Sequence, residues 1–201
     1  QGLSGPRVQH EKGHGFNATA TQALTEKDLV DLDFGAAHGL ELVALSFVGE
    51  AGDVERLRAE MQKRSYQARV IAKIERKIAL ECLDEIIASA DGIMIARGDL
   101  GNEIPLEEIP VVQHQILAAA NAAKKPVIVA TQMMLSMTHE HEPTRAEVTD
   151  VFQAVLDGAD GVMLSEETTV GEHPARVVAE MERILTEAEK HRGARETIPL
   201  I

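Results

Sequence analysis

Cysteine is almost absent from this chain, since Cys82 is the only one among 201 residues. An internal disulfide needs two cysteines, so none can form, and a reducing, cytoplasmic setting is the expectation. The apolar residues around Cys82 recur at helical spacing: Ile78, Leu83, Ile86 and Ile87. The pattern predicts that Cys82 is a small buried apolar residue in a helix and not a nucleophile.

Long apolar runs and a surplus of basic residues are also missing. No apolar stretch approaches the roughly 20 residues that a membrane-spanning helix needs. The 33 Asp and Glu outnumber the 20 Lys and Arg, which gives a formal net charge of −13. Such an acidic surface repels nucleic acid and anionic membranes, and neither is expected as a partner. A local cation can still create a site for a phosphorylated metabolite. The chain begins with Gln1 instead of Met, so its start is expected to be processed, engineered or the edge of a fragment.

What the sequence does contain is a series of five short apolar runs, rich in β-branched residues and bounded by turn-forming residues. Successive runs begin roughly 25 to 35 residues apart, about the length of one β–α unit, and an amphipathic helical stretch fills each gap. This order predicts parallel strands that form a buried sheet. The runs are Leu42–Val48, Arg69–Glu75, Gly92–Ala96, Pro126–Gln132 and Gly161–Ser165.

Helix signals occur in the gaps. Thr25, followed by acidic residues, opens a predicted helix, and Thr144 with Glu147 forms a capping box before another. Pro174 takes a first helical position in a helix that we expect to run to Gly193. Elements of both kinds therefore alternate along the chain.

The fold predicted from this order is an α/β barrel of the (β/α)8 TIM type, incomplete, with about five parallel strands. A closed barrel takes eight strands and roughly 250 residues. An open sheet of five units is the alternative architecture, and the chemistry at the strand ends favours the barrel. The predicted core is Val43, Leu45, Ile71, Ile93, Ile95, Ile128, Val129, Val162 and Leu164.

Residues capable of chemistry gather at the carboxyl ends of the runs, where α/β barrels place their sites. Lys73 and Glu75 are two apart on the second run, so both side chains leave the same face of that strand. The third run ends in Arg-Gly-Asp-Leu-Gly, whose glycines let backbone amides approach an anion closely. The fourth run presents Thr131 and the fifth Ser165, with Glu167 close behind. An inert ion pair, a glycine turn and two helix caps are the alternative explanations of these features taken one at a time.

Five strings of sequence together resemble the signature segments of the pyruvate kinase family, in the family's order and spacing: IAKIE, DGIMIARGDLGNEIP, KPVIVATQMMLSM, PTRAEVTDV and DGADGVMLSEET. The resemblance covers about residues 24–190. It implies a cytoplasmic phosphotransferase of glycolysis that uses magnesium and potassium, converting phosphoenolpyruvate and ADP to pyruvate and ATP. It also implies a homo-oligomer in a full-length parent.

The resemblance assigns roles to particular residues. Lys73 is similar to the family's catalytic lysine, and Glu75 and Asp99 are similar to its ligands for Mg²⁺ or Mn²⁺. Thr131 matches the substrate-binding, catalytic threonine, and Ser165 and Glu167 match residues implicated in proton delivery. The segment that matches the backbone receiving the substrate carboxylate is Ala96, Arg97, Gly98 and Asp99.

The resemblance also divides the chain. Residues 1–23 are expected to be a remnant of the return segment of the family's lid domain, or a linker. Residues 24–195 are expected to be a partial catalytic barrel, and 196–201 the start of a linker to a C-terminal domain. The segment that carries most potassium ligands in the family does not occur here, so the chain alone is expected to be inactive or nearly so.

The sequence departs from the family pattern at some positions, and it leaves alternative functions open. Glu166 stands where the family has glycine or alanine, and Gly49 where it often has arginine. His139 and His141 are spaced like metal ligands but are expected to lie in a solvated loop. The alternative functions are a truncated, non-catalytic scaffold or regulator, and a lyase or aldolase of the phosphoenolpyruvate/pyruvate barrel superfamily.

Overall fold

The computed structural model describes residues 24–193 and 197–200, and within it the chain divides into two compact units. The N-terminal unit extends to Gly92, and the C-terminal unit comprises Ile93–Leu200. The predictions made for residues 1–23, and those for positions 196 and 201, lie outside the described residues. Each unit is a set of β–α elements.

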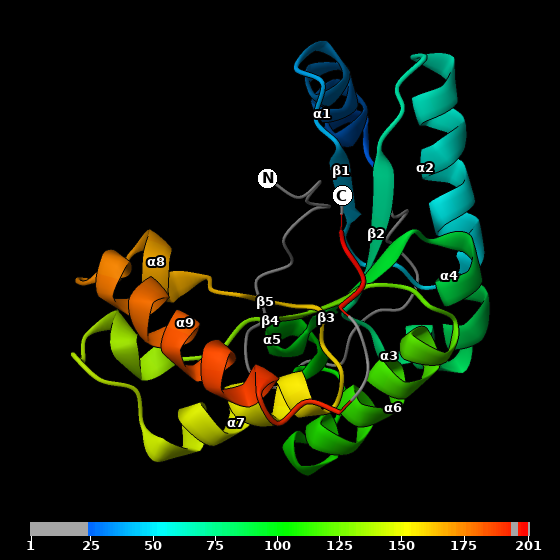
Figure 1. The fold of residues 1–201 in the computed structure, drawn as a ribbon. Coiled ribbons are helices and arrows are strands. Elements are labelled where there is room, and N and C mark those ends of the chain that lie inside the picture. The colour runs from blue at the N-terminus through cyan, green and yellow to red at the C-terminus, as the bar shows by residue number, and fades with distance from the viewer. Residues whose placement is uncertain (1–23, 194–196, 201) are drawn as a thin grey trace. The chain divides into compact units, whose positions relative to one another are not determined.

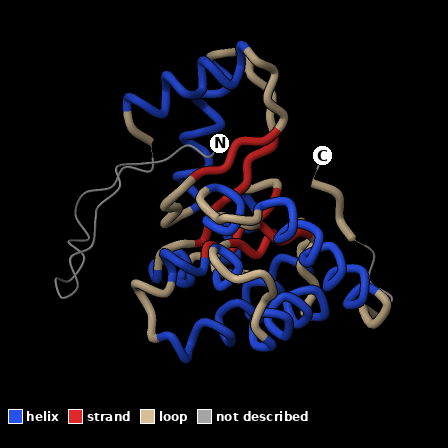
Figure 2. Tube along the Cα trace, turned by 90° about the vertical axis from the view of Figure 1, so that its left-hand side faces the viewer, coloured by secondary structure: helices blue, strands red, loops and turns tan. Residues whose placement is uncertain are grey.

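In the N-terminal unit two parallel strands alternate with helices (Figure 1). Strands β1 and β2 pair with Leu42 opposite Arg69 and Leu45 opposite Ala72. In Figure 2 these two strands run side by side, next to long helices. The elements are α1 (Glu26–Ala37), β1 (Leu42–Leu45), α2 (Ala51–Lys63), β2 (Arg69–Ile74), α3 (Lys77–Glu81) and α4 (Leu83–Ser89).

In the C-terminal unit three strands pair in parallel in the order β3, β4, β5. Ile93 lies opposite Val127, and Ile128 lies opposite Gly161. Helices α7 and α9 pack along one another in this unit (Figure 1). The elements are β3 (Gly92–Ala96), α5 (Arg97–Leu100), η1 (Leu106–Glu108), α6 (Ile109–Ala122), β4 (Val127–Ala130), η2 (Leu135–Thr138), α7 (Arg145–Leu156), β5 (Gly161–Met163), α8 (Glu166–Thr169) and α9 (Pro174–Glu189).

The five predicted strands and the parallel pairing are confirmed, and the described residues form an α/β fold with five strands, as expected for part of a (β/α)8-type barrel. The predicted caps also form: Thr25 caps α1 and Thr144 caps α7, each in a reciprocal capping box. Among the described helices, none combines the length and apolar composition required to cross a bilayer.

Three predicted core residues, Ile128, Val162 and Leu164, are only half-buried, and this part of the prediction was wrong. The register explains Ile128, because its neighbour on β5 is Gly161, which has no side chain to cover it. Val162 and Leu164 lie on and just after β5, which pairs on one side only in the described residues. The other six predicted core residues are buried: Val43, Leu45, Ile71, Ile93, Ile95 and Val129.

Two helix predictions need correction. Cys82 is half-buried and lies at the break between α3 and α4, where its φ of −117° and ψ of 26° leave the helical region. The apolar spacing around it therefore spans two short helices, and Ile78 is exposed. Helix α9 ends at Glu189 and does not reach Gly193; the backbone turns at Lys190–Arg192, after Ala188, the last buried residue of the apolar face.

Candidate active site

The carboxyl end of β2 in the N-terminal unit carries an ion pair whose carboxylate is buried. Lys73 Nζ lies 2.5 Å from Glu75 Oε1 and donates a hydrogen bond of 3.0 Å to Ser46 Oγ. The second carboxylate oxygen, Glu75 Oε2, accepts a 2.6 Å hydrogen bond from the Phe47 amide. The side chain of Glu75 is 1% exposed and that of Lys73 is 20% exposed. A buried carboxylate is costly without such partners, so the two strand ends hold it in one place.

Ser46 and Phe47 follow β1 and were not predicted from the sequence as site residues. Phe47 has a φ of 57°, a left-handed conformation that is rare for a bulky residue. That conformation accompanies the donation of the Phe47 amide to Glu75. Their position at the carboxyl end of the first predicted strand was the only signal that could have identified them.

In the C-terminal unit the turn after β3 meets the end of β4. The Gly98 amide donates a 2.8 Å hydrogen bond to the Thr131 hydroxyl oxygen. A Cβ at position 98 would lie 3.3 Å from that same oxygen, so glycine allows the close approach. Ala96 is buried and Asp99 is exposed. The structure thus brings together Gly98 and Thr131, two residues that the sequence predicted separately.

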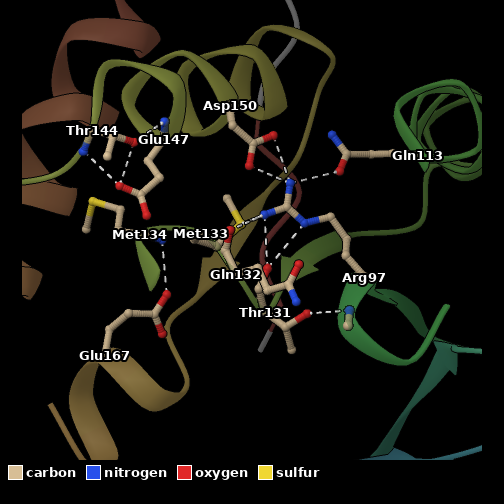
Figure 3. Close-up of polar contacts among 11 residues, drawn as sticks. Arg97, Gln113, Thr131, Gln132, Met133, Met134, Thr144, Glu147, Asp150 and Glu167 are labelled. Carbon is tan, nitrogen blue, oxygen red and sulfur yellow. Dashed lines mark hydrogen bonds and ion pairs between the residues drawn. The ribbon is translucent and has the colours of Figure 1, made fainter. Parts of the chain in front are cut away.

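The Arg97 side chain is directed into the C-terminal unit, where it binds backbone and side-chain oxygens of that unit (Figure 3). It is 8% exposed, and its guanidinium donates to Thr131 O at 2.9 Å and to Gln132 O at 3.0 Å. The same group binds both carboxylate oxygens of Asp150, at 2.8 and 2.6 Å, and Gln113 Oε1 at 3.4 Å. At position 97, therefore, only the backbone is available to a substrate carboxylate.

Glu167 is also buried and bonded to backbone. Its oxygens accept hydrogen bonds from the Met134 amide, at 3.0 Å, and from the Ser165 amide, at 2.8 Å. Glu167 has no exposed surface, whereas Ser165 is half-buried (Figure 3 shows Glu167 below Met134). The carboxylate therefore ties the segment after β4 to the end of β5.

Glu147 makes a third tie to the segment after β4. Its carboxylate accepts from the Ser136 amide at 2.7 Å, from Ser136 Oγ at 2.5 Å and from the Thr144 amide at 2.8 Å. Burial opposes ionisation of this carboxyl, but the hydrogen bonds from Ser136 and Thr144 outweigh it, so the pKa of Glu147 is lowered from its ordinary value.

The two units each carry part of the predicted site. Lys73 and Glu75 belong to the N-terminal unit; Ala96, Asp99, Thr131, Ser165 and Glu167 belong to the C-terminal unit. Glu75 and Asp99, the two carboxylates that the sequence predicts as ligands of a divalent ion, belong to different units. In the described residues no group of three or more His, Cys, Asp or Glu is placed to hold a metal.

The histidine pair suspected from the sequence lies in the turn before α7. His139 Nδ1 is 3.1 Å from Glu172 Oε1, and the ring of His141 stacks on that of His173 with centroids 4.1 Å apart. His139 and His141 are exposed, as expected for a solvated loop.

Comparison with known proteins points to one family. The family model "Pyruvate kinase, barrel domain" matches residues 6–178. The chain is 50% identical over 171 residues to the pyruvate kinase of Thermococcus litoralis. The matched region covers 85% of this chain and 36% of that protein. It is 52% identical to the enzyme of Corynebacterium efficiens, over 83% of the chain and 35% of the relative. It is 44% identical to the enzyme of Thermotoga maritima, over 92% of the chain and 40% of that relative. The chain thus spans about two fifths of the length of these relatives.

Proposed function

The chain belongs to the pyruvate kinase family, and we propose that it forms the catalytic part of an enzyme that transfers the phosphoryl group of phosphoenolpyruvate to ADP. The observation that carries the proposal is the pairing of Lys73 with the buried Glu75 at the carboxyl end of β2, 2.5 Å apart. The pairing holds the partly exposed Lys73 ammonium at the carboxyl end of a strand, where α/β barrels place their sites. On this proposal residues 24–195 are the partial barrel domain, working in the cytoplasm within a homo-oligomer.

In the proposed reaction the bond between phosphorus and the enol oxygen breaks, and a bond to a terminal oxygen of ADP forms. The enolate left behind takes a proton at carbon to become pyruvate. Such transfers depend on positioning and on stabilisation of charge, because little covalent chemistry falls to the protein. Lys73 places a positive charge against the moving group, and Ser46 and Glu75 hold its ammonium in position.

The turn after β3 and the end of β4 would bind the organic part of the substrate. Backbone amides near Gly98 receive the carboxylate, with the Thr131 hydroxyl beside them. The Thr131 and Ser165 hydroxyls, or water bound to them, deliver the proton to the enolate carbon. Glu167 acts on this step indirectly by fixing the Ser165 amide.

Glu75 and Asp99 would hold Mg²⁺ or Mn²⁺, because carboxylate oxygens are the ligands that such hard divalent ions prefer. When bound, the ion supplies charge that stabilises the phosphoryl and enolate oxygens. Potassium is proposed for the whole protein from the family alone. The relatives named above are pyruvate kinases, which supports the kinase over a lyase or aldolase.

Manganese titration followed by water-proton relaxation tests the proposal. We expect Asp99→Asn and Glu75→Gln to weaken Mn²⁺ binding strongly, because each removes one of the two charged ligands. Glu107→Gln, an exposed carboxylate on η1, is the matched control and should leave the affinity unchanged. Unchanged Mn²⁺ affinity in Asp99→Asn would rule out the assignment of that ligand.

A further inference from the structure

The string from Pro143 to Asp150 has no direct place in the proposed reaction, yet it is among the most specific strings by which the sequence resembles its family. The structure shows where it acts. Thr144 caps α7, Glu147 binds the backbone and hydroxyl of Ser136, and Asp150 binds the guanidinium of Arg97. Glu147 thus contacts a residue that follows β4. Asp150 contacts Arg97, which in turn binds the segment after β4 (Figure 3).

The segment that receives these contacts is conformationally strained. Thr131 and Gln132 have φ values of 69° and 54°, both in the left-handed region. A β-branched residue such as Thr131 rarely adopts this conformation, and it persists only where the surrounding structure enforces it. The strained residue is also the one whose hydroxyl accepts the Gly98 amide.

Arg97 binds the backbone of both left-handed residues. Its guanidinium donates to the carbonyl oxygens of both left-handed residues, at 2.9 and 3.0 Å. A buried guanidinium needs a negative partner, and Asp150 supplies one with both carboxylate oxygens, at 2.8 and 2.6 Å. Asp150 thereby orients the fork of Arg97, and the fork holds the two carbonyls.

From these contacts we infer that Asp150 is a positioning residue that acts through Arg97 to hold Thr131 and the Gly98 amide in their working arrangement. The inference rests on the proposed function, because Thr131 and Gly98 are the residues proposed to bind the substrate. Asp150 itself touches no reacting atom. Its effect is transmitted along one path, from the carboxylate to the guanidinium and then to the two strained peptides.

Hydrogen exchange measured by mass spectrometry on the full-length protein tests the path without relying on activity. We expect Asp150→Asn and Arg97→Lys to speed exchange in the peptides covering residues 96–101 and 130–134 by roughly tenfold, the effect of losing a charge-assisted hydrogen bond. Lysine cannot span the two carbonyls and the carboxylate as the guanidinium fork does. Asp157→Asn, at the end of the same helix, is the matched control and should leave both peptides unchanged.

Steady-state kinetics on the same variants test the positioning role. The turnover number should fall by up to about a hundredfold in Asp150→Asn, because small displacements of positioned groups cost that much, while KM for phosphoenolpyruvate changes far less. Asp150→Glu should restore part of the loss. The double variant should be no slower than the slower single variant, since both residues act in series.

The outcomes separate the two claims. Unchanged exchange in both peptides would overturn the inference whatever the kinetics show. Faster exchange with unaltered turnover would also overturn it, because the path would then hold the backbone without serving catalysis. If the unsubstituted full-length protein did not transfer phosphoryl from phosphoenolpyruvate, the proposed function would fail. The exchange measurement would still show whether Asp150 and Arg97 hold the two peptides, because it does not depend on activity.

Discussion

Ile95 is a residue whose contribution to the stability of the fold comes from its burial. It lies in β3 with no exposed surface, and its neighbour across the sheet is Val129, which is equally buried. We expect Ile95→Asp to cost about 3–5 kcal/mol, because it leaves an unpaired charge in an apolar interior. Thermal and urea unfolding should show loss of the cooperative transition in this variant.

Val178→Asp is the control for that substitution, since Val178 is 51% exposed on α9. It should change the free energy of unfolding by about 0.5 kcal/mol or less. A soluble Ile95→Asp protein that melts cooperatively near the original temperature would contradict the assignment of β3 to the core.

Lys73 is the residue on which the proposed chemistry depends most. In the full-length protein Lys73→Ala should lower turnover by roughly a hundredfold to a thousandfold, the loss expected when a charge that stabilises the transition state is removed. KM for phosphoenolpyruvate should change much less, because the charge acts mainly in the transition state. Lys27→Ala, which removes an exposed lysine paired with Asp31, is the control. Equal effects on turnover and on substrate binding would speak against this role.

At the scale of elements, η2 and α7 are joined by a carboxylate that is stabilised in its charged form. The pKa of Glu147 is lowered from 4.5 in the folded protein. Because the folded pKa lies below the unfolded one, the carboxylate contributes stability above pH 4.5, and this contribution is lost as the pH falls through the folded pKa. We therefore expect Glu147→Gln to destabilise the protein at pH 7 and progressively less as the pH falls below 4.5.

Urea unfolding at a series of pH values measures this difference. Glu182→Gln, an exposed carboxylate on α9, is the control and should give a difference that stays small at every pH. A destabilisation by Glu147→Gln that stayed constant from pH 7 down to pH 3 would show that the ties to Ser136 and Thr144 do not depend on the charge.

At the scale of the whole chain, the described residues supply five strands, against eight in a closed barrel of this type. Among them β1 and β5 each pair on one side only, and unpaired strand edges recruit other strands. We expect the 201-residue chain by itself to convert phosphoenolpyruvate and ADP very poorly, and to associate or aggregate. A coupled assay for pyruvate, with size-exclusion chromatography and light scattering, measures both. Rapid turnover from a uniform monomer would contradict this expectation.

Local patterns in the sequence predicted the five strands, two helix caps and the side of β2 on which two of the candidate site residues lie. Alternation of apolar runs with helical stretches predicted all five strands, and the caps at Thr25 and Thr144 form as predicted. Such features depend on neighbours a few residues away, so they can be read directly from the order of residues. The same order placed Lys73 and Glu75 on one face of a strand, where the structure pairs them.

The tertiary structure alone decided which residues far apart in the sequence bind one another. Arg97 binds Asp150, 53 positions away, and Glu75 accepts the Phe47 amide, 28 positions away. Nothing local in the sequence specifies such partners, because they meet only when separate β–α units fold together. The half-buried state of Ile128 likewise follows from its register against Gly161. Spacing predicts which side of an element a residue faces, but burial and hydrogen bonding depend on what the rest of the fold brings to that side.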